Sequence, residues 1–322
     1  AYGSNAFLGV VNIITRHAAE TRGAVAELRT GSGGIEDRRL RLGAGGENLN
    51  LRLTAETQND RGLDNFRDDL RRRLVDVRAD WRLGLRDELQ LQLGEIATGQ
   101  QQGSNKVDDP WRSQAQRQQF VAIGWRRALG DAEDLALRYY RSEERAGDAF
   151  AFALGPFSVP LDYGFSSVRN NVEVVHTFRP LANTRLAWGG ELRTDAVTGA
   201  LYYGRADAVS LTIGRVFGNL EWRPGHDWVA NAGATWEYDS NAKTTFAPRF
   251  ALNRHVAPGQ TLRAGIARAY RTPSLFETRS DFAVRASDGT ALLRRYLSTG
   301  TVEPERVTSR EIGWLAEFPA IS

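Results

Sequence analysis

The stretch Tyr-Gly-Ser-Asn-Ala-Phe-Leu-Gly-Val-Val-Asn-Ile-Ile-Thr-Arg, residues 2–16, differs in character from everything that follows it. Gly3 and Gly9 free the backbone where side chains would crowd it. Residues 10–15 form a short apolar, β-branched run that only Asn12 interrupts. Such a run, bounded by a turn and a charge, predicts a strand that is buried on both faces. The competing interpretation is a buried strand of a soluble α/β domain, but no helical pattern follows to complete one.

After residue 23 the apolar residues recur with a period of two. Leu49, Leu51 and Leu53 alternate with polar neighbours, and Ala232 follows Asn231 in the same way. Successive side chains of a strand point to opposite faces, so each segment has one apolar and one polar face. Most segments run about 9–13 residues, the length that a tilted strand needs to cross a bilayer. The predicted strands are residues 23–31, 36–45, 48–58, 71–82, 87–97, 116–129, 133–144, 166–178, 183–193, 209–223, 227–238, 245–255, 260–270 and 308–316.

The connections between these strands alternate between two kinds. The tight ones, rich in Gly, Pro, Asp and Asn, are residues 46–47, 84–86, 130–132, 179–182, 223–226 and 257–259. The other set is long at residues 59–70, 98–115, 145–165, 194–208 and 271–307, and short only at 32–35 and 239–244. Short turns at one end and long loops at the other predict an all-β, antiparallel, up-and-down transmembrane β-barrel. A β-propeller would show a repeat of about 40–45 residues, and none is found.

Composition excludes several classes of protein. The mean hydropathy of −0.43 and the lack of an apolar run of about 20 residues exclude a helical membrane protein, although not a β-barrel. Without cysteine there is no disulfide framework and no thiolate metal site. The net charge is only +3, and acids are interleaved with the arginines, so we expect no nucleic-acid binding. Without methionine or a signal peptide, we expect the chain to be a piece of a longer exported protein.

No residue pattern in the chain predicts catalysis. The four histidines, His17, His176, His226 and His255, are not spaced as metal ligands. There is no Gly-x-Ser-x-Gly nucleophile motif, and the Asp-rich stretches lack the spacing of a calcium loop. We therefore expect no enzyme activity, no cofactor and no bound metal.

The opening stretch resembles the end of the plug domain of TonB-dependent outer-membrane receptors. In that family a Tyr-Gly-Ser-x-Ala-x-x-Gly-Val-(Val/Ile)-Asn-Ile-(Ile/Val)-Thr-(Lys/Arg) run closes the plug just before the first barrel strand. Tyr2, Gly3, Gly9 and Asn12 occupy matching positions here, and Leu8 stands where the family is often smaller.

A second block, Arg-Ala-Tyr-Arg-Thr-Pro-Ser-Leu-Phe-Glu at residues 268–277, resembles the mid-barrel pattern of the same receptors. A long loop follows it, then Pro-Glu, a Ser and Glu-x-Gly. The chain departs from the pattern at Val302 and Glu303, where the family usually has a short apolar residue after Asn-Pro. The matching residues are Arg271, Pro273, Glu277, Pro304, Glu305, Glu311 and Gly313.

The resemblance covers essentially the whole chain and implies its organisation. The barrel of these receptors has twenty-two strands, and about fourteen are predicted here. We therefore expect residues 1–17 to be the C-terminal end of a plug domain, including its last strand. Residues 18–322 would then be an incomplete receptor β-barrel.

The resemblance also implies a function. A receptor of this family in the bacterial outer membrane would bind a ferric siderophore outside the cell and import it into the periplasm with energy from TonB. TonB would act through an N-terminal box that this chain lacks, and outer-membrane lipid and lipopolysaccharide would surround the barrel. Cobalamin, haem or a glycan are alternative ligands. A passive porin-like barrel is an alternative class, although a porin needs no plug, and a soluble β-sandwich binding module is a third.

The long loops are where an extracellular ligand would arrive first. Aromatic side chains together with arginine suit a ferric siderophore, which has an aromatic or hydroxamate shell and is often negatively charged. The candidate ligand-binding residues are Trp111, Tyr163, Phe165, Tyr202, Tyr203 and Arg205.

Overall fold

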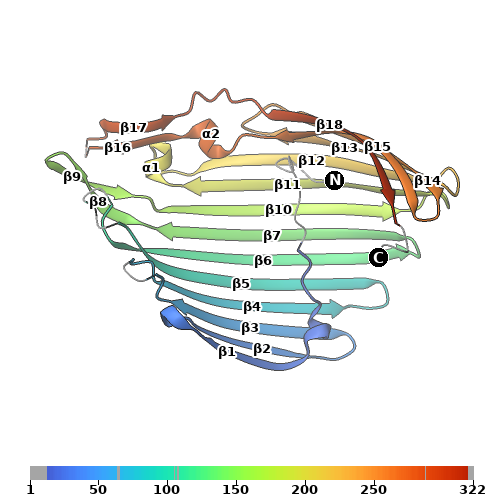
Figure 1. The fold of residues 1–322 in the computed structure, drawn as a ribbon, viewed down its shortest axis with the longest axis horizontal. Coiled ribbons are helices and arrows are strands. Elements are labelled where there is room, and N and C mark those ends of the chain that lie inside the picture. Colours follow the sequence, from blue (N-terminus) through green and yellow to red (C-terminus); the bar gives the residue numbers. More distant parts are fainter. Residues whose placement is uncertain (1–12, 64–65, 105, 107–108, 287, 318–322) are drawn as a thin grey trace.

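The computed structural model describes residues 13–63, 66–104, 106, 109–286 and 288–317. One antiparallel sheet of fourteen strands forms a wall whose strands follow one another in chain order (Figure 1). The wall begins at β1 and ends at β18, and only two small hairpins, β8–β9 and β16–β17, stand outside it among the described residues. The antiparallel up-and-down order and the number of wall strands are those that the sequence predicted.

The wall strands are β1 Gly23–Thr30, β2 Glu36–Gly45, β3 Leu49–Asp60, β4 Leu70–Arg82, β5 Asp87–Gln102, β6 Arg112–Gly130, β7 Glu133–Gly147, β10 Phe165–Phe178, β11 Thr184–Thr198, β12 Val209–Trp222, β13 Trp228–Asp239, β14 Thr245–Ala257, β15 Gln260–Arg271 and β18 Glu305–Ala316. The remaining elements are β8 Ala149–Leu154, β9 Phe157–Asp162, β16 Asp281–Arg285, β17 Ala291–Leu297, the helices α1 Ala200–Tyr203 and α2 Leu275–Arg279, and the 3₁₀ turns η1 Ala18–Thr21 and η2 Ser32–Gly34.

The two faces of the wall differ as the period-two pattern predicts. One cross-strand row joins Leu51, Ala79 and Leu91, and it lies on an outer face where many large apolar side chains are exposed. In the next row Arg52 lies opposite Arg78. Both side chains point to the other face of the wall, which is polar. A one-residue step along a strand thus exchanges an apolar surface for a charged one.

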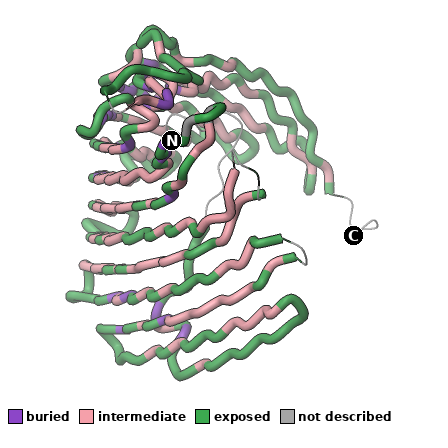
Figure 2. The backbone as a smooth tube through the Cα atoms, turned by 90° about the vertical axis from the view of Figure 1, so that its left-hand side faces the viewer, coloured by how far each residue is buried: buried purple, intermediate pink, exposed green. Residues whose placement is uncertain are grey.

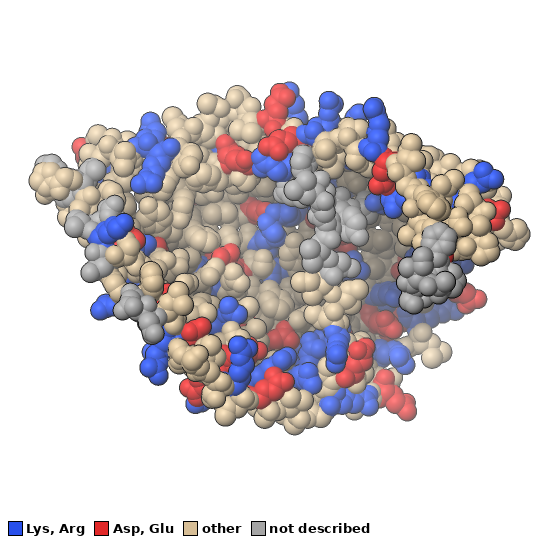
Figure 3. Space-filling view, viewed as in Figure 1, with Lys and Arg blue, Asp and Glu red and all other residues tan. Residues whose placement is uncertain are grey.

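The wall is bent into a trough, and its polar face is the concave one. Figure 2 shows the curved profile, open along one side. Figure 3 looks into the trough, where basic and acidic side chains are interleaved. Among the described strands, β1 and β18 each pair with a single neighbour and form the two edges of the wall. Such edges leave backbone N–H and C=O groups unpaired, which a bilayer does not tolerate.

The strands reach beyond their predicted ends on the long-loop side. β5 and β6 remain paired as far as Gln102 and Arg112, and β7 runs to Gly147. The loop predicted at residues 145–165 holds the β8–β9 hairpin, and the loop at 271–307 holds α2 and the β16–β17 hairpin. No strand or helix was predicted within these two long loops. Short paired segments satisfy backbone groups that an irregular loop would leave open.

The chain enters the wall through an extended segment. Residues 13–17 cross the trough in front of the sheet (Figure 1) and belong to no strand. Ile13 and Ile14 are 82% and 85% exposed. Half of the strand predicted over residues 10–15, namely residues 10–12, lies outside the described residues. Its described part, residues 13–15, is neither in a strand nor buried, because no described strand runs beside it as a partner.

Buried apolar side chains gather at the long-loop end instead of in a layer between sheets. One cluster consists of Val209, Leu211, Ile213 and Leu275, which joins β12 to α2. A second cluster consists of Val159, Leu161 and Val284, which joins the two hairpins. None of the helices in the described part of the chain is long and apolar enough to cross a membrane.

Candidate ligand-binding site

Aromatic rings from three separate loops meet above the trough at its long-loop end. We call Phe150, Tyr163, Tyr202, Phe276, Phe282 and Tyr296 the aromatic cluster. Tyr163 lies 6.3 Å from Tyr202 and 6.1 Å from Phe282 between ring centroids. Tyr202 stacks on Phe282 at 5.6 Å, and its hydroxyl donates a hydrogen bond of 3.1 Å to the carbonyl of Tyr163. Edge and offset contacts of this kind hold the loops together as one body.

The short helix α1 directs its two tyrosines to different places. It ends at Gly204, whose φ of +66° lies in the left-handed region that glycine favours. Tyr202 joins the aromatic cluster, whereas Tyr203 packs against the buried cluster that contains Leu211 and Leu275. Burial raises the pKa of both phenols above its ordinary value. Both hydroxyls stay protonated at neutral pH, and that of Tyr202 serves as a neutral donor.

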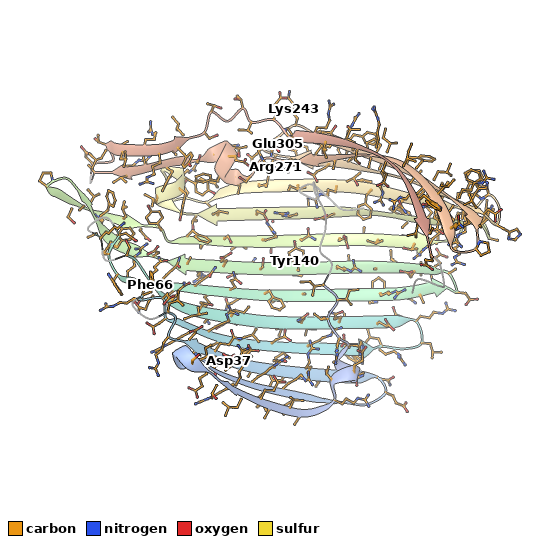
Figure 4. All side chains as sticks on the ribbon, in the orientation of Figure 1. Asp37, Phe66, Tyr140, Lys243, Arg271 and Glu305 are labelled. Carbon is orange, nitrogen blue, oxygen red and sulfur yellow. The ribbon has the colours of Figure 1, made fainter. Side chains whose placement is uncertain are left out.

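An arginine clamp closes the base of the loop that contains α2. Ser274 caps the helix, and the carboxylate of Glu277 accepts a hydrogen bond from the backbone N–H of Ser274, which completes a capping box. Arg271 donates to both oxygens of Glu277, at 3.0 and 3.1 Å, and to Glu305 at 2.6 Å. These hydrogen bonds from Arg271 and from the backbone of Ser274 lower the pKa of Glu277 to about 2. Figure 4 shows Arg271 and Glu305 close together near α2.

A recess in the trough lies beneath these loops. It has a volume of about 600 Å³, and inward-facing side chains of β6, β7, β10, β11 and β12 line it together with residues 272–275. Such a volume falls within the range of small-molecule sites in proteins. Gln118 and Ser142 supply neutral polar groups, Leu275 supplies an apolar one, and Pro273 belongs to the rim.

Three charged groups of the recess form one network. Asp195 accepts hydrogen bonds from Arg169, at 2.7 Å from Nε, and from Arg193, at 3.1 Å from Nε. Arg169 retains 41% of its side-chain exposure, whereas Arg193 retains 19% and Asp195 only 11%. The shared carboxylate fixes both guanidinium groups, and Glu143 and Glu144 also line the recess. The fixed guanidinium donors suit a ligand that presents hydrogen-bond acceptors.

A further network ties the start of β6 to the loop before it and to the residue that precedes β8. Arg112 donates a hydrogen bond of 2.6 Å to Asp148 and another of 2.7 Å to Asp109. The bond from Arg112 lowers the pKa of Asp109. The guanidinium carbon of Arg112 also lies 4.1 Å from the ring centre of Phe150, so a cation–π contact joins this network to the aromatic cluster.

The structure brings some of the predicted ligand-binding residues together and separates others. Tyr163 and Tyr202 meet in the aromatic cluster. Trp111 lies elsewhere, under the guanidinium of Arg67 at 4.2 Å. Arg205 pairs with its neighbour Asp207 and is exposed. Phe165 begins β10 rather than lying in a loop, and Tyr203 contributes to packing.

Some residues that match the family pattern also lie at the site, and others lie away from it. Arg271, Glu277 and Glu305 form the clamp described above, while Pro304 directly precedes β18. Glu311 pairs with Arg263 at 2.7 Å on the inner face, and Gly313 lies opposite that arginine in the register. Tyr2, Gly3, Gly9 and Asn12 lie outside the described residues.

The loop-based prediction missed Arg169, Arg193 and Asp195. They lie on strands, where alternation alone assigns them to the polar face. The spacing Arg193-x-Asp195 could have indicated this ion pair, because residues two apart on a strand face the same side. Among the described residues, no three His, Asp or Glu side chains are grouped so as to hold a metal ion.

Solved structures share this fold. The siderophore receptor PirA from Pseudomonas aeruginosa superposes with a TM-score of 0.73 at 16% identity, over 98% of this chain and 57% of that one. A variant of the ferric enterobactin receptor PfeA from the same organism gives 0.77 at 16% identity, over 98% and 54%. The copper transporter OprC gives 0.65 at 14% identity, over 91% and 51%. The chain thus spans little more than half the length of these receptors.

Sequence comparison points to the same family. No curated protein matches the chain. Residues 36–318 match the family described as "TonB dependent receptor-like, beta-barrel", which takes in most of the 322 residues. Proteins of that family are transporters rather than enzymes, and they reside in the bacterial outer membrane. The chain belongs to the TonB-dependent receptor family and forms part of its β-barrel wall.

Proposed function

We propose that the native protein is an active-transport receptor that binds a ferric siderophore outside the cell and imports it into the periplasm with energy from TonB. The observation that carries this proposal is the recess of about 600 Å³ beneath the long loops. Arg169 and Arg193 supply guanidinium groups there, and Phe120 lines it with an aromatic ring. A ligand with an aromatic shell and negative charge would find both kinds of partner in one place.

The proposal assigns residues 1–17 to the end of a plug domain. In support, the segment before β1 is held to the inner face of the wall. Arg78 donates a hydrogen bond of 2.6 Å to the hydroxyl of Thr15, and Arg52 donates one of 3.1 Å to the carbonyl of Arg16. A plug tied to the wall at this point would fill the lumen between the loops and the periplasm.

One of the fold relatives is named as a siderophore receptor and another as a ferric enterobactin receptor, which agrees with this choice of ligand. Their identity to this chain is too low to transfer a ligand, so cobalamin, haem and a glycan remain the competing ligands. These ligands differ in charge and size, and binding to the purified protein separates them.

The recess is tested with Arg169→Ala in the full-length native protein. We expect the affinity for a ferric siderophore to fall about tenfold, equivalent to about 1.4 kcal/mol. Arg249→Ala is the matched control, because Arg249 also faces the trough but bonds to Asn219, outside the recess. Equal affinities of the two variants would contradict the assignment of the recess as the ligand site.

A further inference from the structure

A second hollow lies on the inner face of the wall, at the short-turn end of β3–β7. It has a volume of about 280 Å³, and we call it the lower hollow. None of the residues that line it also lines the recess beneath the long loops, so the two spaces are separate. A single cross-strand row runs through the lower hollow, and each of its residues lies opposite the next: Asn50, Asp80, Gln90, Gly124 and Arg138.

The lower hollow exists because two residues at its centre are small. Gly124 has no side chain, and a Cβ atom placed there would meet nothing nearer among the described residues than the Cβ of Gln90, at 3.9 Å. Ala136 on the neighbouring strand β7 adds only a methyl group. The backbone ladder holds neighbouring strands about 4.8 Å apart, so the wall cannot close over the space that these residues leave.

Arginine side chains surround this space. Arg126 and Arg138 keep 62% and 65% of their side-chain exposure. Arg126 lies 3.5 Å from Asp134, and exposed pairs of this kind are weak. Arg138 donates a hydrogen bond of 2.9 Å to Glu173, and a guanidinium has five N–H groups, so further donors remain for a ligand. Four arginines and three acids line the lower hollow and leave one positive charge in excess: Arg78, Arg82, Arg126, Arg138, Glu47, Asp80 and Glu88.

The segment before β1 closes the lower hollow on one side. His17 belongs to its lining, and the imidazole Nε2 lies 3.6 Å from the carboxylate of Asp80. The same carboxylate accepts hydrogen bonds from the backbone N–H of Ala18 and from the guanidinium of Arg78. The lower hollow is therefore present while this segment is attached to the wall. With residues 1–17 as the end of a plug domain, as proposed above, it lies between that plug and β3–β7.

The lower hollow lies below the recess, nearer the short turns, on the same two strands. On β6 the recess extends to Phe120 and the lower hollow begins at Gly124, and Ala122 is the inward-facing residue between them. On β7 the corresponding residues are Ser142 and Arg138. Four residue positions on each strand span about 13 Å at about 3.3 Å per residue. A ligand that leaves the recess toward the periplasm along β6 and β7 meets the lower hollow next.

We propose that the lower hollow is an intermediate binding site for the imported ferric siderophore, reached after the recess and before the periplasm. The inference rests on the proposed function and adds a second site to it. Acceptor oxygens of one iron-binding arm would take hydrogen bonds from the guanidinium groups of Arg126 and Arg138 and from the amide of Gln90. A volume of about 280 Å³ is small for a whole ligand, so part of an anionic complex would enter. Exposed donors bind weakly enough to release the complex, as a transport site must.

The test measures binding and uptake separately on the full-length native protein. The probe is a radiolabelled ferric tris-catecholate, which is an anionic complex. Cells without TonB report surface binding, and cells with TonB report the maximal rate of uptake. Gly124→Leu fills the lower hollow, and a side chain causes no backbone strain there because the φ of Gly124 is not positive. We expect the uptake rate to fall about tenfold while the binding affinity stays within about twofold of the native value.

The role of the guanidinium is tested by a second pair of variants. Arg138→Gln removes the charge and should lower the maximal rate of uptake several-fold, again without a loss of binding affinity. Arg138→Lys keeps the charge and should retain most of the native rate. The number of surface binding sites reports how much of each variant reaches the outer membrane, so a folding defect is separated from a transport defect.

Two controls alter the trough face away from the lower hollow. Ala251→Leu adds bulk opposite Asn231, and Arg249→Gln removes a guanidinium that bonds to Asn219. Both should bind and import the probe as the native protein does. Equal uptake by Gly124→Leu and Ala251→Leu would overturn the proposal. A parallel loss of affinity and uptake in Gly124→Leu would overturn it too, because the lower hollow would then belong to the first binding site. If the native protein neither binds nor imports the probe, the proposed anionic ligand is wrong, and this inference falls with it.

Discussion

The backbone N–H of Ala18 donates a hydrogen bond of 2.7 Å to the carboxylate of Asp80, across 62 positions of the chain. The same carboxylate accepts from Arg78 at 2.8 Å, and both side chains are almost fully buried. Arg78 also reaches Thr15. The point at which the chain joins the wall is therefore fixed by charged side chains of β4, on the inner face and near the short turns.

Asp80→Asn should weaken this junction. The change leaves the buried guanidinium of Arg78 without its nearest counter-charge, and we expect it to lower the free energy of unfolding by about 2 kcal/mol. Denaturant unfolding of the full-length protein in micelles measures this. Asp134→Asn is the control, because Asp134 lies 3.5 Å from an exposed Arg126, and such pairs contribute about 0–1 kcal/mol. Equal losses of unfolding free energy in the two variants would show that Asp80 stabilises the protein no more than an exposed ion pair does.

Ala232→Arg should destabilise the protein more than Asn231→Arg. Ala232 lies opposite Leu220 and Phe250 on the outer, lipid-facing side, whereas Asn231 faces the trough. An arginine facing lipid near the midplane costs about 2–4 kcal/mol, and one in the lumen costs less. Unfolding from lipid vesicles compares the two directly. Indistinguishable unfolding midpoints would mean that the assigned facing of β13 is wrong.

Tyr202→Phe should loosen the loops without removing a ring. It deletes the hydrogen bond to the carbonyl of Tyr163 and keeps the stacking on Phe282, so we expect a loss of about 1 kcal/mol. Limited proteolysis of the β8–β9 hairpin should become several-fold faster. Tyr203→Phe is the matched control, because the Tyr203 hydroxyl has no hydrogen-bond partner among the described residues. Faster cleavage in both variants alike would argue against the hydrogen bond as the cause.

Acid should destabilise the folded conformation of the loop between β15 and β18. The pKa of Glu277 is lowered from 4.5 to about 2, so its ionised form stabilises the folded loop. That stabilisation is complete above pH 4.5, declines as the pH falls, and is lost below about pH 2. Hydrogen exchange of residues 272–304 should therefore be constant from pH 7 to about 5, after correction for intrinsic rates, and accelerate below. Glu277→Gln should flatten this dependence, and an unchanged profile would exclude Glu277 as the titrating group.

Much of the wall could be predicted from the sequence, because one physical pattern repeats in every strand. Leu51 and Arg52 illustrate it, since adjacent side chains must face opposite media. The strand ends at the long-loop side were less predictable. Beyond the apolar band the pattern fades, and pairs such as Gln100 with Gln114 continue the ladder through backbone hydrogen bonds. Backbone pairing leaves no hydrophobic signal in the sequence.

The candidate site was only partly predictable, because it is assembled from parts far apart in the chain. Tyr163 and Tyr202 could be named from their loops, but their contact with Phe282 depends on how three loops fold over one another. Arg169 and Asp195 lie on neighbouring strands, and pairing those strands in register would have placed them together. The sequence alone does not show which inward-facing charges line a recess and which merely face water.

Uptake by the full-length native protein tests the proposed function most directly. The protein would be expressed in an outer-membrane-competent host that lacks its own siderophore receptors, and accumulation of a labelled ferric siderophore would be followed with TonB present and absent. We expect accumulation that requires TonB and that falls in the Arg169→Ala variant. If the correctly inserted protein accumulates no ferric siderophore under either condition, the proposed ligand is wrong, and cobalamin, haem or a glycan takes its place.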